Sequence, residues 1–583
     1  MTYSVSVEKI TERRGVLKRS GAVGGSALLA GGAVGSALLL SLFASPAGAA
    51  STFTVDTKAD GVANASDCTT PVASSCSLRD ALAAATTDGD VIVFAAALSG
   101  QTISLSEGEL QTEAGITITG LGSANLTIDA EGNSRGFYIY TATSGVEVAI
   151  SGLSIINGDA DGNGGGGLYD SHDGDLTLSD VSITGCVANV GGAVYKAAGG
   201  KAGGTLEIVD STISDNYASD DSGALNMGGL GDLIITNSTF DGNDAGNSGI
   251  FGRNRSGGVG RISNDGNITI TDSTFSNNTA QSGGGAFYFR NKGDVSISGS
   301  TFSGNTASDD SGGGAVFSLN AGLFTVTSST FSGNTSTSWG GALYLGTDDQ
   351  VITVTDSLFV DNASTYEGGA LDFDGNDQVV TVNNSTFVGN TSGSNGGAIW
   401  KENGGSLTIN MSTITENSAS YGGGVWFYYG GSGQPDVTIT GTILTGNTGT
   451  GGAADDLNVQ DQYDAVATIS NSILGVVDAD ITVTASNNID ATAPGFVLGL
   501  GALADNGGAT ETMALLAGSP AIDAGPATVP TFVGNGFDQR GTPYVRVYNG
   551  QSDIGAFESQ PDPTPTTTTT VASDETVVPA FTG

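Results

Sequence analysis

The sequence predicts an all-β protein, a parallel β-solenoid with about 28 residues in each coil. Three features of a repeat between about residues 145 and 475 carry this prediction. Apolar residues alternate with Thr and Ser in short segments that close on an Asn. That Asn recurs every 27 to 35 residues, from Asn189 to Asn447. A block of the type Gly-Gly-Ala-apolar follows most of the Asn residues, as at 284–287 and 340–343.

Each part of the repeat has a physical role in a solenoid. Alternation with period two, rich in β-branched residues, is typical of strands that bury one face. A unit of this length cannot bury that face alone, so it must stack on its neighbours. Asn tolerates left-handed backbone at a corner, and its amides can bond from coil to coil, while the Gly pair permits the next tight corner. Propeller blades, the main alternative, usually run to about 40 residues or more, which favours the solenoid.

Five regions follow one another along the chain of 583 residues. Residues 1–49 are predicted to be an export signal, because an uncharged stretch follows Arg13-Arg14 and ends on Ala-Gly-Ala. The paired Arg resembles a twin-arginine signal; an ordinary secretory signal and an uncleaved anchor are the alternatives. We interpret 50–144 as an N-terminal cap and first coils, 145–480 as the repeat β-helix, 481–558 as a C-terminal domain and 559–583 as a Pro/Thr-rich disordered tail.

The net charge and the cysteines indicate in which compartment the protein acts and argue against one class of partner. The net charge of −42 repels phosphate, which argues against a nucleic-acid partner. Cys68 and Cys76 enclose a short polar loop that an oxidising compartment can close as a disulfide. We therefore expect a secreted or cell-surface monomer, with no membrane-spanning domain in the mature chain.

Three motifs resemble known families. The pairing of Phe-x-x-Asn with Gly-Gly-Ala-[Ile/Leu/Val] resembles the repeats of chlamydial polymorphic outer-membrane proteins, which are surface adhesins. "CSLRDAL" at 76–82 is similar to the CSLREA-type motif of secreted bacterial β-helix proteins, with Asp80 in place of Glu. The stretch 518–558, from "GSPAIDAG" to "SDIGAFE", resembles the choice-of-anchor C-terminal domain of right-handed β-helix proteins. These resemblances imply a right-handed parallel β-helix, a short capping helix at 78–85 and a role in adhesion.

An aromatic column is the first candidate for ligand binding. The residue after Gly-Gly-Ala is apolar and faces the core, so the next one must point outward. Asn226 and Asp372 support that direction, since an unpaired carboxylate in a narrow core is costly. The other six of the eight outward positions are aromatic: Tyr195, Tyr288, Phe317, Tyr344, Trp400 and Trp426. We expect an exposed row that binds sugar rings or a partner protein; stacking that only stabilises the coils is the alternative.

Two loops are further candidates. An insertion at 249–267 carries Arg253, Arg255 and Arg261, which suit an acidic polysaccharide or, alternatively, pair with nearby carboxylates. A second loop has the spacing of a calcium site, although it also aligns with an ordinary corner. Its candidate ligands for Ca²⁺ are Asp159, Asp161, Asn163 and Asp170. "DFDGND" at 372–377 is a weaker candidate of the same kind.

These features predict adhesion or glycan binding, with an extracellular polysaccharide or a surface glycoprotein as the partner. The alternative is a polysaccharide lyase, with Ca²⁺, or a glycoside hydrolase acting on an acidic polysaccharide. Such an enzyme needs one acidic and basic cleft that interrupts the repeat, and the sequence predicts that only region 244–292 supplies it. A structural spacer of the cell envelope is the third hypothesis.

Overall fold

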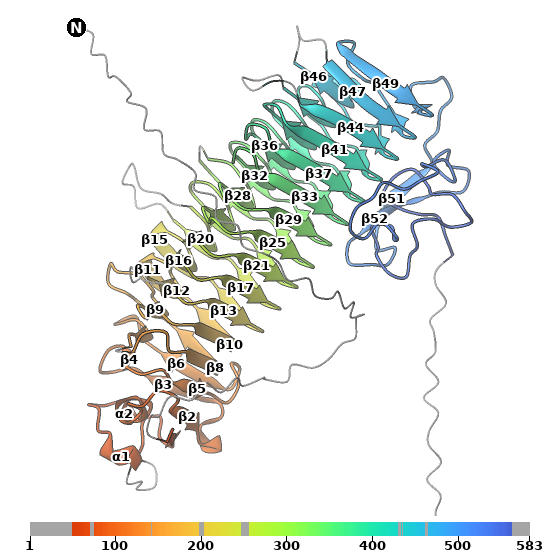
Figure 1. Cartoon of the computed structure of the whole chain (residues 1–583). Helices are drawn as coiled ribbons and strands as arrows, with labels where there is room; N and C mark the ends of the chain where they lie inside the picture. The colour runs from red at the N-terminus through yellow and green to blue at the C-terminus, as the bar shows by residue number, and fades with distance from the viewer. Residues whose placement is uncertain are drawn as a thin grey trace, which may run out of the picture. The chain divides into compact units, whose positions relative to one another are not determined.

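The computed structural model describes residues 49–69, 75–141, 143–197, 203–246, 256–309, 311–428, 433, 435–460 and 465–561. The predicted export signal up to residue 48 and the tail from 562 lie outside these residues. Within them the chain winds into a parallel β-helix in which every coil extends the same sheets (Figure 1). Equivalent residues of successive coils pair at intervals of 28 or 29 residues in the middle of the repeat, as Phe302 with Phe331 and Phe331 with Phe359. The predicted solenoid and the predicted length of its coil are confirmed.

Three parallel sheets run along the β-helix, here named A, B and C. Sheet B has thirteen strands: β4 (Leu110–Thr112), β7 (Phe137–Ile139), β9 (Leu168–Asp170), β12 (Val194–Lys196), β16 (Leu225–Gly229), β20 (Gly260–Asn264), β24 (Phe287–Phe289), β28 (Val316–Ser318), β32 (Leu343–Leu345), β36 (Leu371–Phe373), β40 (Ile399–Lys401), β43 (Val425–Phe427) and β46 (Leu457–Val459). Sheet C has eight: β11 (Val187–Val190), β15 (Tyr217–Asp221), β19 (Asp244–Ala245), β23 (Thr279–Ala280), β27 (Thr306–Ala307), β31 (Thr335–Ser336), β35 (Ala363–Ser364) and β39 (Thr391–Ser392).

Sheet A has 29 strands in two rows that meet at a bend. The first row comprises β1 (Thr52–Val55), β2 (Val91–Phe94), β5 (Thr117–Thr119), β8 (Val148–Ile156), β10 (Leu176–Thr184), β13 (Leu206–Val209), β17 (Leu233–Thr236), β21 (Ile268–Thr271), β25 (Val295–Ser298), β29 (Phe324–Thr327), β33 (Val351–Thr355), β37 (Val379–Asn383), β41 (Ser406–Asn410), β44 (Asp436–Thr440), β47 (Ala465–Ser470) and β49 (Ile481–Ser486). The second row contains β3 (Gln101–Ser104), β6 (Leu126–Asp129), the ends of β8 and β10, β14 (Thr212–Ser214), β18 (Thr239–Asp241), β22 (Thr274–Ser276), β26 (Thr301–Ser303), β30 (Thr330–Ser332), β34 (Leu358–Val360), β38 (Thr386–Val388), β42 (Thr413–Thr415), β45 (Ile443–Leu444), β48 (Ile473–Leu474) and β50 (Ile489–Asp490).

Buried Asn side chains form a ladder at the corner between sheets A and C. Its nine members are Asn216, Asn243, Asn278, Asn305, Asn334, Asn362, Asn390, Asn417 and Asn447. Each donates from its backbone N–H and its Nδ2 to Oδ1 of the next, as Asn334 does to Asn362 at 3.0 and 2.9 Å. The ladder ends at Asp456, whose Oδ1 accepts both bonds from Asn447 at 2.8 and 2.9 Å.

The structure corrects two details of this corner. The left-handed backbone belongs to the residue before each ladder Asn, as at Gly333 (φ 60°), because the Asn side chain itself turns inward. Asn189 is not a rung, since β11 pairs with β15 through Val187 and Tyr217. Cys186 therefore occupies the rung position of this coil, and its backbone N–H donates to Asn216 Oδ1 at 3.0 Å. A similar ladder of buried Ser lines the bend of sheet A, as where Ser273 N–H donates to Ser300 Oγ at 3.1 Å.

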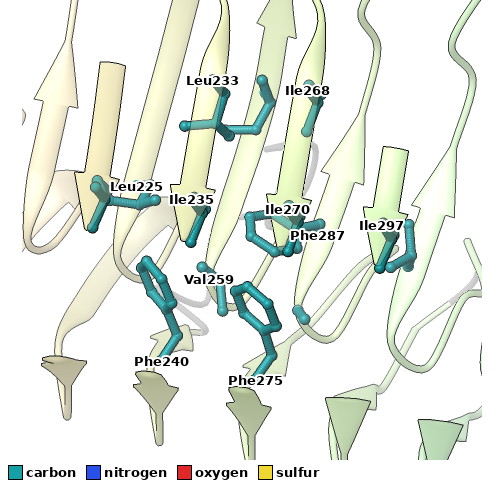
Figure 2. Close-up of a cluster of buried hydrophobic side chains, with 14 of the residues drawn as sticks. Leu225, Leu233, Ile235, Phe240, Val259, Ile268, Ile270, Phe275, Phe287 and Ile297 are labelled. Carbon is teal, nitrogen blue, oxygen red and sulfur yellow. The ribbon is translucent and has the colours of Figure 1, made fainter. Parts of the chain in front are cut away.

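The core is a stack of matching side chains, one from each coil. The Phe of each Phe-x-x-Asn motif is fully buried, and six of them stack in sequence from Phe240 to Phe387 with centroids 4.6–5.2 Å apart. Figure 2 shows Phe240 and Phe275 among the inward side chains of Ile235, Ile270 and Phe287. Burial of one large apolar side chain in each coil supplies the main driving force for stacking the coils.

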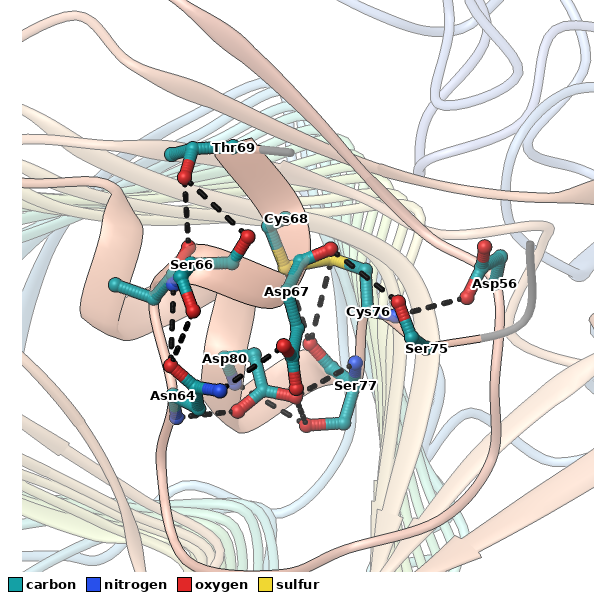
Figure 3. Close-up of a disulfide and its surroundings, with 11 residues drawn as sticks. Asp56, Asn64, Ser66, Asp67, Cys68, Thr69, Ser75, Cys76, Ser77 and Asp80 are labelled. Carbon is teal, nitrogen blue, oxygen red and sulfur yellow. Dashed lines mark hydrogen bonds between the residues drawn. A yellow bond between two sulfur atoms is a disulfide. The ribbon is translucent and has the colours of Figure 1, made fainter. Parts of the chain in front are cut away.

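A small cap closes the N-terminal end. Helix α2 (Leu78–Ala84) begins with a capping box in which Ser77 and Asp80 bond each other's backbone N–H, so the shorter Asp performs the role of Glu. Leu78 and Leu82 pack on the core, as predicted for a capping helix. A disulfide joins Cys76 to Cys68, at the end of α1 (Ser66–Thr69) (Figure 3). Two short 3₁₀ turns, η1 (Ala96–Leu98) and η2 (Thr450–Gly452), complete the helical elements of the described residues.

The C-terminal segment folds back on the second row of sheet A. Its antiparallel hairpin, β51 (Leu500–Ala504) and β52 (Thr512–Leu515), lies beside the sheet in Figure 1. Met513 packs against Leu358 and Val388 on the outward face of β34 and β38. Thr386 Oγ1 donates to Gln539 Oε1 at 2.6 Å. The contacts of this segment with the β-helix lie on the second row of sheet A, between β34 and β48. None of the helices in the described residues is long and apolar enough to cross a membrane.

Candidate functional site

The outward position of sheet B forms one continuous column. Pairing between neighbouring strands places its members in register, one from each coil. In order they are Gln111, Tyr138, Tyr169, Tyr195, Asn226, Arg261, Tyr288, Phe317, Tyr344, Asp372, Trp400, Trp426 and Asn458. The column thus contains all six aromatic residues predicted from the sequence. It also contains Tyr138 and Tyr169, which the sequence analysis missed because their coils lack a Gly-Gly-Ala block.

The aromatic residues of the column are less exposed than predicted. Phe317, Trp400 and Trp426 are only 8, 7 and 5% exposed. The cause is the stacking itself. Phe317 lies between Tyr288 and Tyr344, with centroids 4.8 and 4.7 Å away, so both of its faces are covered. Trp400 and Trp426 cover one face of each other, with centroids 4.1 Å apart. Only ring edges and the ends of each stack remain available to a ligand.

One pocket interrupts the column, and we name it the acidic pocket. It has a volume of about 330 Å³ and is lined by Trp339, Glu367, Asp372, Asp374, Trp400, Glu402 and Tyr428. Trp339 and Glu367 each precede a Gly-Gly corner, and Asp374, Glu402 and Tyr428 each follow a sheet B strand by one residue. The lining therefore comes from equivalent positions of successive coils.

Asp372 is the most unusual group of the acidic pocket. It points out of the sheet, as predicted, yet it is only 1% exposed, and its Oδ1 has no hydrogen-bond partner among the described residues. Burial raises its pKa well above the usual range, and repulsion from Asp374, Glu367 and Glu402 adds to the rise. Asp372 is thus an outward-pointing but buried carboxyl group with an unused acceptor.

The other carboxyl groups of the pocket lie close enough to affect one another's pKa. Burial raises the pKa of Glu402 to about 7, and a hydrogen bond with Asp374 contributes. Asp374 also accepts a hydrogen bond from the Tyr344 hydroxyl. Burial raises the pKa of Glu367 too, although donors on Trp339 and Ser394 oppose the rise. These rises show that the pocket has too little positive charge of its own to stabilise all of its carboxyl groups in the ionised form.

Lys401 is the cation whose charge acts on Asp372, but its side chain lies on the inner side of β40. Its Nζ donates to the backbone carbonyls of Glu402 and Asn403. Burial lowers the pKa of Lys401 to about 8, against the pull of the surrounding carboxylates. The ammonium is thus held by backbone oxygens, and Lys401 does not line the pocket.

A second hollow, named the tyrosine hollow, lies further toward the N-terminus along the column. It measures about 570 Å³ and is lined by Arg135, Tyr138, Gly162, Asn163, Gly164, Tyr169, Asn189, Val190, Tyr195 and Asp220. The Arg135 guanidinium lies 5.7 Å from the ring centroid of Tyr138 and 5.2 Å from that of Tyr169. It also pairs with Glu109 at 2.8 Å. Six coils separate Tyr195 from Asp372, which is about 29 Å at the usual spacing of strands.

The predicted calcium ligands do not form one site. Asp170 is fully buried at the end of β9, where Oδ2 accepts from Lys196 Nζ at 2.7 Å and Oδ1 bonds His172. Asp159 instead accepts the N–H of Asp161 at 2.8 Å in a local turn, and this loop pairs with the next coil as an ordinary corner. The residues that the structure describes contain no group of three or more His, Cys, Asp or Glu able to hold a metal ion.

The predicted basic site is also dispersed. Arg253 and Arg255 lie outside the described residues. Arg261 stands in the column, pairs with Asp221 at 2.9 Å and lies 5.7 Å from the Tyr288 ring centroid, which is the pairing alternative raised from the sequence. Asp265 pairs with Lys292 at 2.6 Å. The acidic pocket thus lies at 339–428, whereas the described residues of the predicted region 244–292 place their charged side chains in separate ion pairs.

Comparisons with known proteins bear on the fold. No curated protein matches the chain. Among solved structures, a PL6 alginate lyase in complex with a trisaccharide is 11% identical with a TM-score of 0.39, over 81% of this chain and 92% of that one. Pectate lyase Pel9A is 13% identical with a TM-score of 0.26, over 88 and 96%. The catalytic unit of a GH87 α-1,3-glucanase from Streptomyces thermodiastaticus strain HF3-3 is 15% identical with a TM-score of 0.25, over 66 and 64%.

At these identities and TM-scores the three likenesses carry no conclusion about activity. A family model described as "Right handed beta helix region" matches residues 223–410. Its description agrees with the predicted hand of the coil. The central repeats of this chain are therefore a right-handed parallel β-helix.

Proposed function

We propose that this protein is exported and binds a polysaccharide along the outward face of sheet B, with the acidic pocket as its principal binding site. One observation carries the proposal. Asp372 presents a buried, unpartnered acceptor to a pocket walled by the side chains of Trp339, Trp400 and Tyr428. Sugars offer what such a pocket lacks, because their hydroxyl groups donate hydrogen bonds while their rings stack on aromatic side chains.

The surroundings of the pocket support a polymeric ligand. The tyrosine hollow lies on the same column, and a third hollow beyond Trp426 is lined by Asn395, Tyr421, Trp426, Asn458, Val459, Gln460 and Asp478. A chain running along the column meets several contacts of this kind, which multiplies a weak affinity for one sugar. Adhesion to a surface glycan follows from such binding when the protein acts at the cell surface as a monomer.

Retention of the purified protein, residues 50–583, on polysaccharides tests the proposal. The panel contains neutral, amino-sugar and uronate polymers. Trp339→Ala removes an aromatic residue that is 37% exposed at the pocket, so we expect at least a tenfold loss of affinity. Phe537→Ala removes an aromatic residue that is 36% exposed on the C-terminal segment and serves as the matched control. Equal retention of the wild type and Trp339→Ala, or no retention on any polymer, overturns the proposal.

Glycoside hydrolysis is the second candidate function. A carboxyl group with a pKa of about 7, as burial gives Glu402, suits a general acid that protonates a leaving sugar oxygen. A lyase is less favoured, because it needs a free basic side chain and the ammonium of Lys401 is held by backbone carbonyls. Release of reducing ends that is lost in Glu402→Gln, without ultraviolet-absorbing unsaturated products, distinguishes hydrolysis from elimination.

A further inference from the structure

Elsewhere in the column, a protein cation lies over the aromatic rings. Arg135 lies over Tyr138 and Tyr169, and Arg261 lies over Tyr288. Within the described part of the chain, no Lys or Arg takes the equivalent place over Trp400 or Trp426. The faces of indole rings attract cations more strongly than those of other aromatic side chains. The acidic pocket therefore includes the indole of Trp400, a strong cation-binding ring over which no Lys or Arg of the described residues lies.

The polar groups of the acidic pocket point to the same class of ligand. Asp372 Oδ1 is an unpartnered acceptor on a side chain that is 99% buried, because only 1% of the residue is exposed. Glu367, Asp374 and Glu402 add further acceptors. A protonated amine supplies three donors and no acceptor, so it matches this set of groups better than a hydroxyl does. A carboxylate on the ligand adds repulsion, which argues against a uronate.

We infer that the acidic pocket selects glycans that carry protonated amino groups, such as polymers of glucosamine, over neutral and acidic glycans. The inference rests on the proposed function and names its ligand class. The ammonium lies among the four carboxyl groups and against the indole of Trp400, while the rest of the sugar contacts Trp339 and Tyr428. Metal ions are a poor alternative, since the described residues offer no cluster of ligands for one.

Three oligosaccharides of equal length test the inference: a glucosamine oligomer, its fully N-acetylated counterpart and a galacturonate oligomer. They are titrated by calorimetry at one slightly acidic pH and low salt. Acetylation removes the charge and keeps the sugar ring. We expect the glucosamine oligomer to bind at least tenfold more tightly than the N-acetylated one and to lose that advantage in Asp372→Asn and Glu402→Gln. Circular dichroism shows whether each variant is folded.

Asp210→Asn is the matched control, because it removes one carboxylate from a corner of sheet A and Asn tolerates the same left-handed backbone (φ 50°). It should keep the full preference for the glucosamine oligomer. Equal or tighter binding of the N-acetylated oligomer overturns the inference and leaves the proposed function intact, provided that Trp339→Ala weakens it. Equal loss of preference in Asp210→Asn also overturns it, because the preference then comes from overall charge. Binding of no oligosaccharide and no polymer overturns both.

Discussion

The indole rings of Trp400 and Trp426 stack face to face, with centroids 4.1 Å apart and an angle of 5° between their planes. Trp339 and Trp400 line the acidic pocket, and Trp426 stacks on Trp400. The sequence contains three tryptophans, so all indole fluorescence of this protein originates at the acidic pocket and at the third hollow, which Trp426 lines. A spectroscopic signal that usually averages over a whole protein reports here on one stretch of the column.

Tryptophan emission should therefore change when a glycan binds. Trp339 is 37% exposed and emits at the longer wavelengths typical of indoles in water, so a bound sugar should shift the spectrum to shorter wavelengths. Trp339→Phe should remove most of the shift. A fluorescence titration measures both, and binding seen by calorimetry without any change in emission would locate the ligand elsewhere.

Loss of one rung of the Asn ladder should be costly. In Asn334→Ala, the carbonyl of Phe302 loses a donor, and the N–H and Nδ2 of Asn305 lose their acceptor. Each buried group left unpaired costs about 1–3 kcal/mol, so unfolding free energy should fall by about 3 kcal/mol or more. Thr335→Ala changes the exposed neighbour and should have little effect. Chemical denaturation compares the two, and equal stability would contradict the structural role of the ladder.

Stability should fall as pH rises from about 5 to about 8. Burial raises the pKa of Asp456 to about 6, of Asp356 to about 7 and of Glu558 to about 8. The folded state therefore binds more protons than the unfolded state across this range. Ionising each group in the folded protein then costs about 1 kcal/mol or more. Thermal unfolding at several pH values measures the slope.

Asp356→Asn isolates one part of this pH dependence. Asn accommodates the left-handed backbone of position 356 (φ 53°), and the variant should show a shallower loss of stability with pH. Asp349→Asn, at an exposed corner with φ 56°, controls for the removal of one negative charge. A wild-type protein that gains stability between pH 5 and pH 8 would contradict the assignment.

Arg261 should act on stability and not on glycan binding. In Arg261→Met, Asp221 keeps its buried position, with 7% exposure, but loses its counter-ion. We expect a loss of about 3 kcal/mol at pH 8 and a smaller loss at pH 5, since burial already raises the pKa of Asp221 to about 6. Asp221→Asn in the same chain should restore stability. Weaker polysaccharide retention at unchanged stability would instead support the ligand-binding role predicted from the sequence.

The coil was predictable because its signals are repeated and local. Phe-x-x-Asn supplies a buried ring and a ladder rung in each of six coils. The fold can therefore be predicted even if the interpretation of a single position is wrong. The error at Asn189 shows the limit of this reasoning. Its coil has Cys186 at the rung position, and only strand pairing reveals that the corner shifted by three residues.

The acidic pocket could not be predicted from any one continuous stretch of the sequence, because its residues come from successive coils. Asp374 and Glu402 occupy equivalent places 28 positions apart, and so do Trp339 and Glu367. An alignment of the repeats, coil under coil, would have shown that acidic and aromatic side chains recur at equivalent positions in three successive coils. The burial of Asp372 could not be predicted from such an alignment, since it depends on how closely the neighbouring corners pack.

The side-chain amides of the Asn ladder all point in the same direction, each Nδ2 toward the Oδ1 of the next coil. An amide is positive at its N–H and negative at its oxygen, so nine aligned amides give the β-helix an electrical polarity along its axis. The positive end lies toward the C-terminal coils, and there the ladder meets the carboxylate of Asp456. Asp456 thus occupies the place that an acidic residue takes at the amino end of an α-helix. The ladder of amides thus ends on a carboxylate that lies nine residues beyond the last Asn in the sequence.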